Sequence, residues 1–327
     1  MKTPFWFFRL NLLAILLLPL SVVYYLISKI VFIYRLFCRK ITKTPVICVG
    51  GLLSGGVGKT PIVREISKYL NVPVLMRGYK GQHPDGLVRI SDSAEDVGDE
   101  AKMLSDSGIS VYVGDRIKNL ETLDFRDEKV SAVVMDDGFQ NPRIEKSISL
   151  VVFDEGVGVG NGLLLPAGPM REGLVSGIRR SDAVLINQQD FGPGCARVIR
   201  IAKRFKKAVF FVRKEMDATG FFGKYVAFAG IGYPNKFFES LRDVTSMRVV
   251  EKVSFSDHHY YTREDIIKLF RIARKYDARL VCTEKDWVKL PRNIQSKVKY
   301  VPLKVGIQSN FYLWLEKKLG EINEKRN

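Results

Sequence analysis

The chain has 327 residues, of which 46% are hydrophobic, so it can bury a substantial core and is not disordered throughout. Its formal net charge of +17 at pH 7 indicates attraction to an acidic partner, which could be nucleic acid, an anionic bilayer or a phosphorylated substrate. The four cysteines show neither metal-ligand spacing nor a paired pattern, which is typical of reduced thiols in the cytoplasm.

An uncharged apolar segment lies near the N-terminus. Residues 12–27, with the apolar residues on either side, are long enough to cross roughly 30 Å of hydrocarbon. Bulky residues at 30–34 stand where the small residues of a signal-peptide cleavage site would be needed, so we expect a retained membrane helix within residues 1–40. Basic residues are concentrated downstream of this segment, which places the rest of the chain in the cytoplasm. A buried or interfacial helix is the alternative, because Pro19 and Lys29 weaken a simple span.

Strand-like and helix-like segments alternate after this N-terminal segment, and this alternation predicts a mostly parallel α/β sheet with helices on both faces. The pattern loosens around residues 210–223 and then resumes, which places a boundary near residue 215. We therefore predict a core domain over 41–215 and a smaller C-terminal α/β domain over 216–327. The expected strands are 45–50, 72–76, 109–113, 130–135, 149–153, 183–186, 225–230, 249–255 and 279–283, and the expected helices include 61–70, 100–107 and 263–276.

The strongest local motif is SGGVGKTP, residues 54–61, between the first expected strand and the helix that follows it. Backbone amides of a glycine-rich loop and the N-terminus of a helix together form an anion site for the β and γ phosphates of a nucleotide. In such a loop Lys59 neutralises phosphate charge and the Thr60 hydroxyl binds Mg²⁺. The strict P-loop pattern has glycine where this chain has Leu53, and an ordinary glycine turn is the alternative. The predicted nucleotide-binding residues are Ser54, Gly55, Gly56, Val57, Gly58, Lys59 and Thr60.

Two adjacent carboxylates, Asp136 and Asp137, follow the expected strand 130–135. A P-loop protein needs a second carboxylate for its metal ion, normally at the end of a neighbouring apolar strand, so these residues fit that position. A polar turn after the strand is the alternative. A P-loop NTPase-like parallel sheet domain is the fold that both motifs predict.

The remaining residues favour a kinase among the P-loop proteins. The guanine-reading motif of GTPases has lysine two residues before its aspartate, but Thr283-Glu284-Lys285-Asp286 has glutamate there. No nucleic-acid-binding module is recognisable. A kinase needs a group that takes the proton of an acceptor hydroxyl, and His258, next to an aspartate in FSDHHYYT, is a candidate, although a solvated turn is the alternative.

Taken in chain order, the motifs resemble those of the tetraacyldisaccharide 4'-kinases, or lipid A 4'-kinases, of Gram-negative bacteria. The similarity covers nearly the whole chain, and it includes an N-terminal membrane segment and a loop that is non-standard at the position of Leu53. The motifs that carry it are GGxGKTP and those at residues 77–79, 97–100, 136–140, 160–162, 164–169, 171–172, 257–258, 283–286 and 288–289.

The resemblance implies transfer of the γ-phosphate of ATP to the 4'-hydroxyl of a tetraacylated glucosamine disaccharide 1-phosphate, which gives lipid IVA, with ATP and Mg²⁺ as cofactors. It implies a lipid A disaccharide precursor and the bacterial inner membrane as partners, with the chain on the cytoplasmic face, no nucleic acid and no obligate protein partner. The site residues that it implies are Asp99, His258 and Lys59 for catalysis and Thr60, Asp136, Asp137 and Glu172 for the metal. Which member of the Asp99–His258 pair accepts the proton is left open.

Two other functions fit the same motifs. One is a membrane-anchored P-loop kinase for a different polyprenyl lipid or glycolipid, which a substrate panel distinguishes. The other is a non-enzymatic protein in which ATP binding only switches conformation, and this one predicts no acceptor-dependent ADP production.

Overall fold

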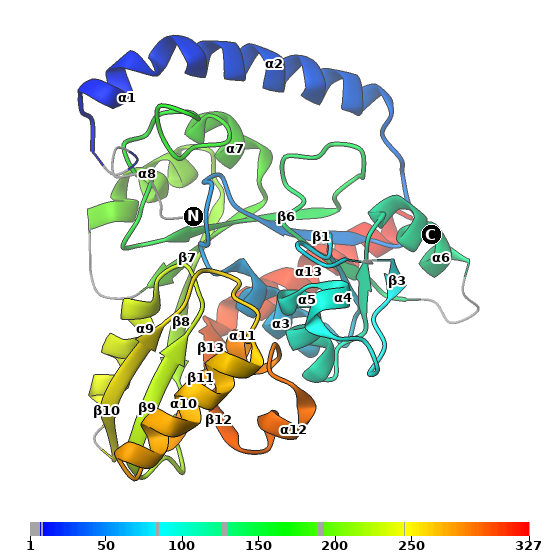
Figure 1. Ribbon diagram of the computed structural model, residues 1–327. Helices are drawn as coiled ribbons and strands as arrows, with labels where there is room; N and C mark the ends of the chain where they lie inside the picture. Colours follow the sequence, from blue (N-terminus) through cyan, green and yellow to red (C-terminus); the bar gives the residue numbers. More distant parts are fainter. Residues whose placement is uncertain are drawn as a thin grey trace. The chain divides into compact units, whose positions relative to one another are not determined.

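The computed structural model describes residues 7, 9–82, 85–125, 130–188, 193–244 and 246–326. The chain divides into two compact units (Figure 1). The larger unit contains residues 3–77, 109–214 and 305–327, and the smaller contains 78–108 and 215–304. The sequence predicted three consecutive domains, 1–40, 41–215 and 216–327, whereas the two units are defined by contacts. Residues 78–108, which were predicted in the core domain, belong to the smaller unit, and residues 305–327, which were predicted in the C-terminal domain, belong to the larger unit.

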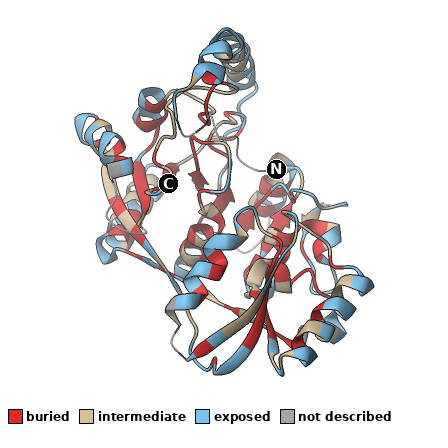
Figure 2. Cartoon of the chain, turned by 60° about the vertical axis from the view of Figure 1, so that its left-hand side comes forward, coloured by how far each residue is buried: buried red, intermediate tan, exposed pale blue. Residues whose placement is uncertain are grey.

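The larger unit is built on a sheet with the strand order β13-β8-β7-β6-β1-β5-β2-β4. Strand β1 pairs in parallel with both β5 and β6, and the parallel pairing continues through β7 to β8 on one side and through β2 to β4 on the other. Every residue of β1, β5 and β6 is buried, as expected for parallel strands covered on both faces (Figure 2). The strands are β1 (Val46–Gly50), β2 (Val74–Leu75), β4 (Val111–Val113), β5 (Val133–Asp136), β6 (Ile148–Asp154), β7 (Ala183–Gln188), β8 (Ala208–Met216) and β13 (Leu303–Ile307).

The helices of the larger unit are α1 (Leu12–Leu16), α2 (Leu18–Phe37), α3 (Lys59–Leu70), α6 (Arg116–Asp124), α7 (Leu174–Arg180), α8 (Ala196–Arg204) and α13 (Ser309–Glu324). Helix α3 buries Ile62, Val63 and Ile66, whose spacing places them on one face of the helix. Helix α2 has the length and apolar composition needed to cross a membrane. Pro19 lies in its first turn, where the missing N–H breaks no helical hydrogen bond, so this residue does not interrupt the helix.

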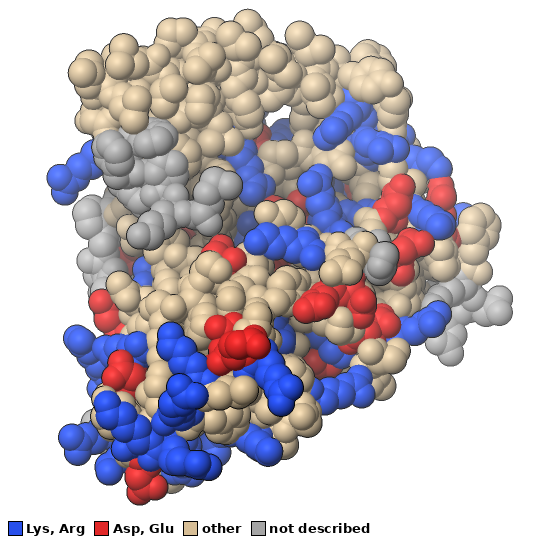
Figure 3. Space-filling model, in the orientation of Figure 1, with Lys and Arg blue, Asp and Glu red and all other residues tan. Residues whose placement is uncertain are grey.

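Apolar side chains of α1 and α2 are exposed over most of their length, and the corresponding surface in Figure 3 is almost free of charged residues. One side of α2 contacts the rest of the larger unit. Ser21 and Tyr24 donate hydrogen bonds to backbone carbonyls of Leu164 and Arg171, and the guanidinium of Arg180 lies 5.1 Å from the ring centre of Phe32. The helix therefore has a face that packs on protein and a wide apolar face that does not.

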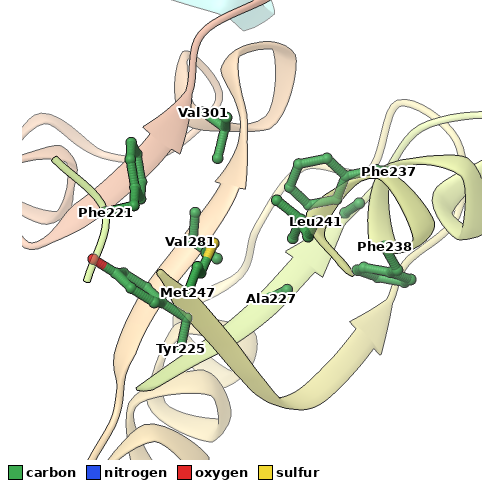
Figure 4. Close-up of a cluster of buried hydrophobic side chains, with 10 residues drawn as sticks. Phe221, Tyr225, Ala227, Phe237, Phe238, Leu241, Met247, Val281 and Val301 are labelled. Atoms are coloured by element: carbon green, nitrogen blue, oxygen red, sulfur yellow. The ribbon is translucent and has the colours of Figure 1, made fainter. Parts of the chain in front are cut away.

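The smaller unit contains a parallel four-stranded sheet with the order β10-β9-β11-β12. Successive side chains of β9 point to opposite faces, so Tyr225 and Ala227 join one apolar cluster (Figure 4) while Val226 and Phe228 join another. The elements of this unit are β3 (Gly86–Leu87), α4 (Ala94–Val97), α5 (Asp99–Asp106), β9 (Gly223–Ala229), α9 (Pro234–Ser240), β10 (Met247–Ser254), α10 (Arg263–Lys275), β11 (Arg279–Thr283), α11 (Glu284–Trp287), α12 (Arg292–Gln295) and β12 (Val298–Val301). The predicted α/β class, with a parallel sheet and a smaller second α/β unit, is confirmed.

Candidate functional site

The glycine-rich loop connects β1 to α3 in the larger unit, as the sequence predicted. Gly58 is the N-cap of α3 and has a φ of +69°, a left-handed conformation that disfavours side chains, and Lys59 begins the helix. Leu53 is buried and forms an isolated antiparallel bridge with Met170. The side chain at the non-standard position therefore packs into the core, and the glycines of the loop begin two residues later.

Other segments of the larger unit hold this loop through its backbone. Lys214 donates to the carbonyl of Gly58 at 3.1 Å, and the side-chain amide of Asn187 donates to the carbonyl of Val57. The amide of Ser54 donates to the carbonyl of Pro169 at 2.7 Å. A loop fixed in this way keeps its amides oriented before an anion arrives, which reduces the entropy cost of binding.

Asp137 lies between two basic side chains. Its Oδ1 atom is 3.3 Å from Nζ of Lys59, and Nη1 of Arg171 is 3.1 Å from its Oδ2 atom. Burial alone would raise the pKa of Asp137, but the charges of Lys59 and Arg171 outweigh burial and lower it. The predicted phosphate-binding lysine and one predicted metal-binding carboxylate are thus in direct contact.

Thr60 and Asp136 form the second contact of this group. Both residues are buried, and the Thr60 hydroxyl donates to Oδ2 of Asp136 at 3.0 Å. The pair forms because β5 lies beside β1 in parallel, which brings the end of β5 next to the start of α3. A hydroxyl and a carboxylate are oxygen donors of the kind that Mg²⁺ prefers, so these residues fit that ion. The described part of the chain contains no group of three His, Cys, Asp or Glu side chains arranged to hold a metal.

Glu172, the other predicted metal residue, has different partners. Its carboxylate accepts two hydrogen bonds from Nη2 of Arg180, at 2.8 and 2.9 Å, and one from the amide of Gln140 at 3.1 Å. Gln140 also donates to the carbonyl of Gly51 at 2.7 Å. Glu172 is therefore connected to the glycine-rich loop through Gln140, and its role at a metal stays a prediction.

Arg116 belongs to this site but was not predicted. Its guanidinium donates to the backbone carbonyls of Asp136 and Asp137. The side chain is buried, and burial, followed by the charge of Arg77, lowers its pKa. Arg116 lies three residues beyond the end of β4, and a basic residue just after a parallel strand was the signal that could have identified it.

Asp99 and His258 form a hydrogen-bonded pair in the smaller unit. Nδ1 of His258 lies 2.7 Å from Oδ2 of Asp99, and Oδ1 of Asp99 accepts from the amide of Glu100 at 2.9 Å. Asp99 begins α5, and His258 has a φ of +59° in the loop after β10, where its amide donates to the carbonyl of Gly230. Asp99 is only 4% exposed, so its carboxylate is shielded from water while it contacts the imidazole.

Charged partners keep Asp99 ionised. Burial alone would raise the pKa of Asp99, but the hydrogen bond from His258 and the charge of Lys285 outweigh it, so the pKa is lowered. The pair can therefore orient an imidazole against a fixed carboxylate, an arrangement suited to proton transfer.

The sequence left the role of the Thr283–Asp286 motif open, and in the structure two of its residues, Lys285 and Asp286, have different roles. Lys285 lies beside the Asp99–His258 pair, with Nζ 3.4 Å from Nε2 of His258. Asp286 is fully buried, pairs with Lys289 at 2.8 Å and accepts from the amide of Gly230. The lysine is thus part of the candidate site, and the aspartate stabilises the loop behind it.

Comparison with known proteins identifies the family. A family profile described as tetraacyldisaccharide-1-P 4'-kinase matches residues 13–320. A tetraacyldisaccharide 4'-kinase of Chelativorans sp. (strain BNC1) is 38% identical over 303 residues, which are 89% of this chain and 86% of that protein. The corresponding protein of Maricaulis maris (strain MCS10) is 37% identical over 267 residues, 79% of this chain and 77% of that protein.

A solved structure matches the fold as well. The crystal structure of LpxK from Aquifex aeolicus in complex with ATP superposes with a TM-score of 0.72 and 25% sequence identity, covering 95% of this chain and 99% of that chain. Similarity of sequence and of structure thus extends over almost the entire length, and the resemblance inferred from the motifs is confirmed. The chain belongs to the tetraacyldisaccharide-1-P 4'-kinase family.

Proposed function

We propose that this chain transfers the γ-phosphoryl group of ATP to the 4'-hydroxyl of a tetraacylated glucosamine disaccharide 1-phosphate, which gives lipid IVA in lipid A biosynthesis. Family membership and the ATP complex of the Aquifex aeolicus protein support the substrate pair. The observation that carries the proposal is the hydrogen-bonded Asp99–His258 pair in a chain that also has a P-loop lysine, because a kinase needs both a phosphate site and a proton acceptor.

The larger unit binds the nucleotide in this proposal. Amides of residues 54–60 contact the β and γ phosphates, and Lys59 neutralises their charge. Lys59 contacts Asp137 in the structure. When the nucleotide binds, Lys59 therefore either leaves Asp137 for the phosphates or contacts both. Arg171 remains beside Asp137 and keeps the carboxylate charge balanced.

Thr60 and Asp136 are the residues that we assign to Mg²⁺, with Asp137 and Glu172 as further candidates. The oxygen-donor chemistry of the Thr60–Asp136 contact supports this assignment. A bound Mg²⁺ would neutralise charge on the phosphate oxygens. The hydrogen bond between Thr60 and Asp136 holds the two oxygen donors next to each other.

In this proposal the smaller unit supplies the residues that act on the acceptor hydroxyl. His258 and Asp99 orient and deprotonate the sugar hydroxyl as its oxygen attacks the γ-phosphorus. The bond from the γ-phosphorus to the β–γ bridging oxygen breaks, and ADP leaves with that electron pair. A positioned acid–base group contributes roughly 10²- to 10⁴-fold to such a reaction.

The apolar helix α2 is compatible with attachment to a membrane, and we propose the cytoplasmic face of the bacterial inner membrane as the location. The exposed apolar side chains of α1 and α2 support contact with lipid, and the basic residues that follow α2 support a cytoplasmic orientation. Acyl chains of the acceptor would then stay in lipid while its sugar reaches the protein. No nucleic acid and no obligate protein partner is part of this proposal.

The test is a phosphotransfer assay with the full chain in detergent or lipid, Mg²⁺-ATP and the disaccharide lipid. We expect acceptor-dependent ADP formation and a phosphorylated lipid, with severe losses in Asp99→Ala and His258→Ala. His259→Gln is the matched control, because His259 pairs with Asp265 and not with Asp99. Turnover with another glycolipid only, or ATP binding with no acceptor-dependent turnover, would reject the proposal in favour of the two alternatives.

A further inference from the structure

Lys285 makes three charged or polar contacts beside the Asp99–His258 pair. Its Nζ atom lies 3.4 Å from Nε2 of His258, 3.6 Å from Oδ2 of Asp99 and 3.2 Å from Oε1 of Glu100. It lies on α11, the short helix that follows β11, and its side chain is only 21% exposed. All four residues belong to the smaller unit, so the cluster is defined within one compact body.

The charge of Lys285 determines what it can donate. Burial alone would lower its pKa, but the carboxylates of Glu100 and Asp99 outweigh burial and raise it, so the group is an ammonium at neutral pH. An ammonium has three donors and no acceptor. Its contact with Nε2 of His258 is therefore a hydrogen bond that the lysine donates and the imidazole accepts.

This contact assigns the tautomer of His258. Nδ1 faces the ionised carboxylate of Asp99 at 2.7 Å, so the imidazole donates there. Nε2 lies 3.4 Å from the ammonium and 3.8 Å from Oδ1 of Asp257, and only the shorter of these distances is within hydrogen-bond range. Its hydrogen-bond partner is thus a donor, to which Nε2 presents a lone pair. The two contacts together select the tautomer that has its proton on Nδ1 and a lone pair on Nε2.

We propose that Lys285 is a positioning residue for the Asp99–His258 pair, which fixes the Nδ1-protonated tautomer and so keeps Nε2 ready to accept the proton of the acceptor hydroxyl. This inference rests on the proposed function. When the hydroxyl occupies Nε2, the flexible lysine stem lets the ammonium move toward Glu100 and Asp99, which are already its partners. The hydroxyl proton then moves to Nε2 while the oxygen bonds to the γ-phosphorus.

A purely structural role for Lys285 makes a different prediction. In that case the ion pair with Glu100 would join α11 to α5, and the contact with His258 would have no consequence. Glu100→Gln removes that ion pair while Lys285 stays next to His258. The two roles are therefore separated by comparing Glu100→Gln with Lys285→Met, which has similar length but no donor.

The tautomer can be measured directly, because the chain has only three histidines, His83, His258 and His259. In ¹⁵N-histidine-labelled full-length protein, the wild type should show a protonated Nδ1 and a bare Nε2 at His258, assigned by loss of signal in His258→Gln. Lys285→Met should give a mixture of tautomers, Lys285→Arg should recover part of the wild-type pattern, and Glu100→Gln should disturb it less than Lys285→Met because Lys285 keeps its contact with Asp99. Lys304→Met, at an exposed lysine paired with Asp217, is the matched control.

Kinetics supply the second measurement. With saturating substrates we expect Lys285→Met to lower kcat by at least roughly tenfold, part of the 10²- to 10⁴-fold effect of a positioned acid–base group. The KM for ATP should stay unchanged, and Lys285→Arg should restore part of kcat. Lys304→Met should remain near the wild type in both parameters, and Glu100→Gln should lose less kcat than Lys285→Met because Asp99 still faces the lysine.

Two results would overturn the inference: an unchanged His258 tautomer in Lys285→Met, or equal losses of kcat and thermal stability in Lys285→Met and Glu100→Gln. The NMR measurement needs no substrate, so it tests Lys285 independently. Absence of acceptor-dependent turnover in the wild type would instead reject the proposed function, with the tautomer result still informative.

Discussion

The hydroxyl of Tyr24 in helix α2 donates a hydrogen bond to the backbone carbonyl of Arg171 at 3.0 Å. The side chain of Arg171 in turn contacts Asp137 at 3.1 Å. On the same helix, Ser21 donates to the carbonyl of residue 164 and accepts from the amide of residue 167. The apolar N-terminal helix is thus hydrogen-bonded to the segment that carries one basic residue of the candidate phosphate site.

We therefore predict that Tyr24→Phe weakens catalysis although Tyr24 contacts no proposed substrate group. Loss of one hydrogen bond of about 0.5–1.5 kcal/mol should lower kcat by no more than roughly tenfold. Hydrogen exchange of amides in residues 164–171 should become faster. Tyr25→Phe, at the exposed neighbouring tyrosine, is the control, and equal effects of the two variants would contradict this connection.

Lys59→Met should abolish most activity while leaving the fold intact. Lys59 is the cation that the glycine-rich loop presents to phosphates, and removal of one such electrostatic group costs roughly 10²- to 10³-fold in kcat. The pKa of Asp137 should rise in this variant, because the attraction of Lys59 is one of the causes that lower it. Phosphotransfer rates and ATP titrations measure the effect. Lys68→Met, at an exposed position of the same helix, should match the wild type, and a normal rate in Lys59→Met would refute the assignment.

Asp99 should contribute to stability in a pH-dependent way. Its pKa in the folded protein is lower than the ordinary value of 3.8, so its contribution is complete above that value and is lost as pH falls through the folded pKa. The difference in unfolding free energy between wild type and Asp99→Asn should be constant near neutral pH and should narrow below about pH 4. Urea unfolding from pH 7 to pH 3 measures it, with exposed Glu239→Gln as the control. A difference that does not change with pH would show that the ionised pair does not stabilise the fold.

Local patterns predicted much of the fold. The expected strand 279–283 coincides with β11, and the expected helix 61–70 corresponds to α3, which begins two residues earlier at Lys59. Both are short-range patterns of apolar residues and turns. Strands β8 and β13 were not predicted as strands: β8 alternates only partly between buried and exposed residues, and β13 depends on a neighbour far away in sequence.

Some residues of the candidate site could likewise be predicted from local patterns, and others could not. Lys59 and Thr60 belong to one continuous motif, and Asp136 ends a strand that could be expected from its apolar run. Asp99 and His258 are 159 residues apart, so only resemblance to a family could pair them before the structure. Arg116 donates to backbone carbonyls, and because every residue has a carbonyl, the sequence does not reveal which residues it contacts.

Asp286→Ala should destabilise the smaller unit strongly. Asp286 and Lys289 are both fully buried and form an ion pair at 2.8 Å, and Asp286 also accepts from the Tyr261 hydroxyl and the Gly230 amide. Removal of the carboxylate leaves Lys289 as a buried charge without its ion-pair partner, which costs roughly 3–5 kcal/mol. Thermal unfolding measures the loss.

The double variant Asp286→Leu with Lys289→Met replaces the ion pair by apolar side chains. It should recover part of the stability, because it leaves no buried charge behind. It should not recover all of it, since the amide of Gly230 and the hydroxyl of Tyr261 still lose their acceptor. Because the carbonyl of Gly230 also accepts from the His258 amide, we expect both variants to lose activity together with stability. Wild-type stability in Asp286→Ala would mean that this buried pair contributes nothing to the loop that holds His258.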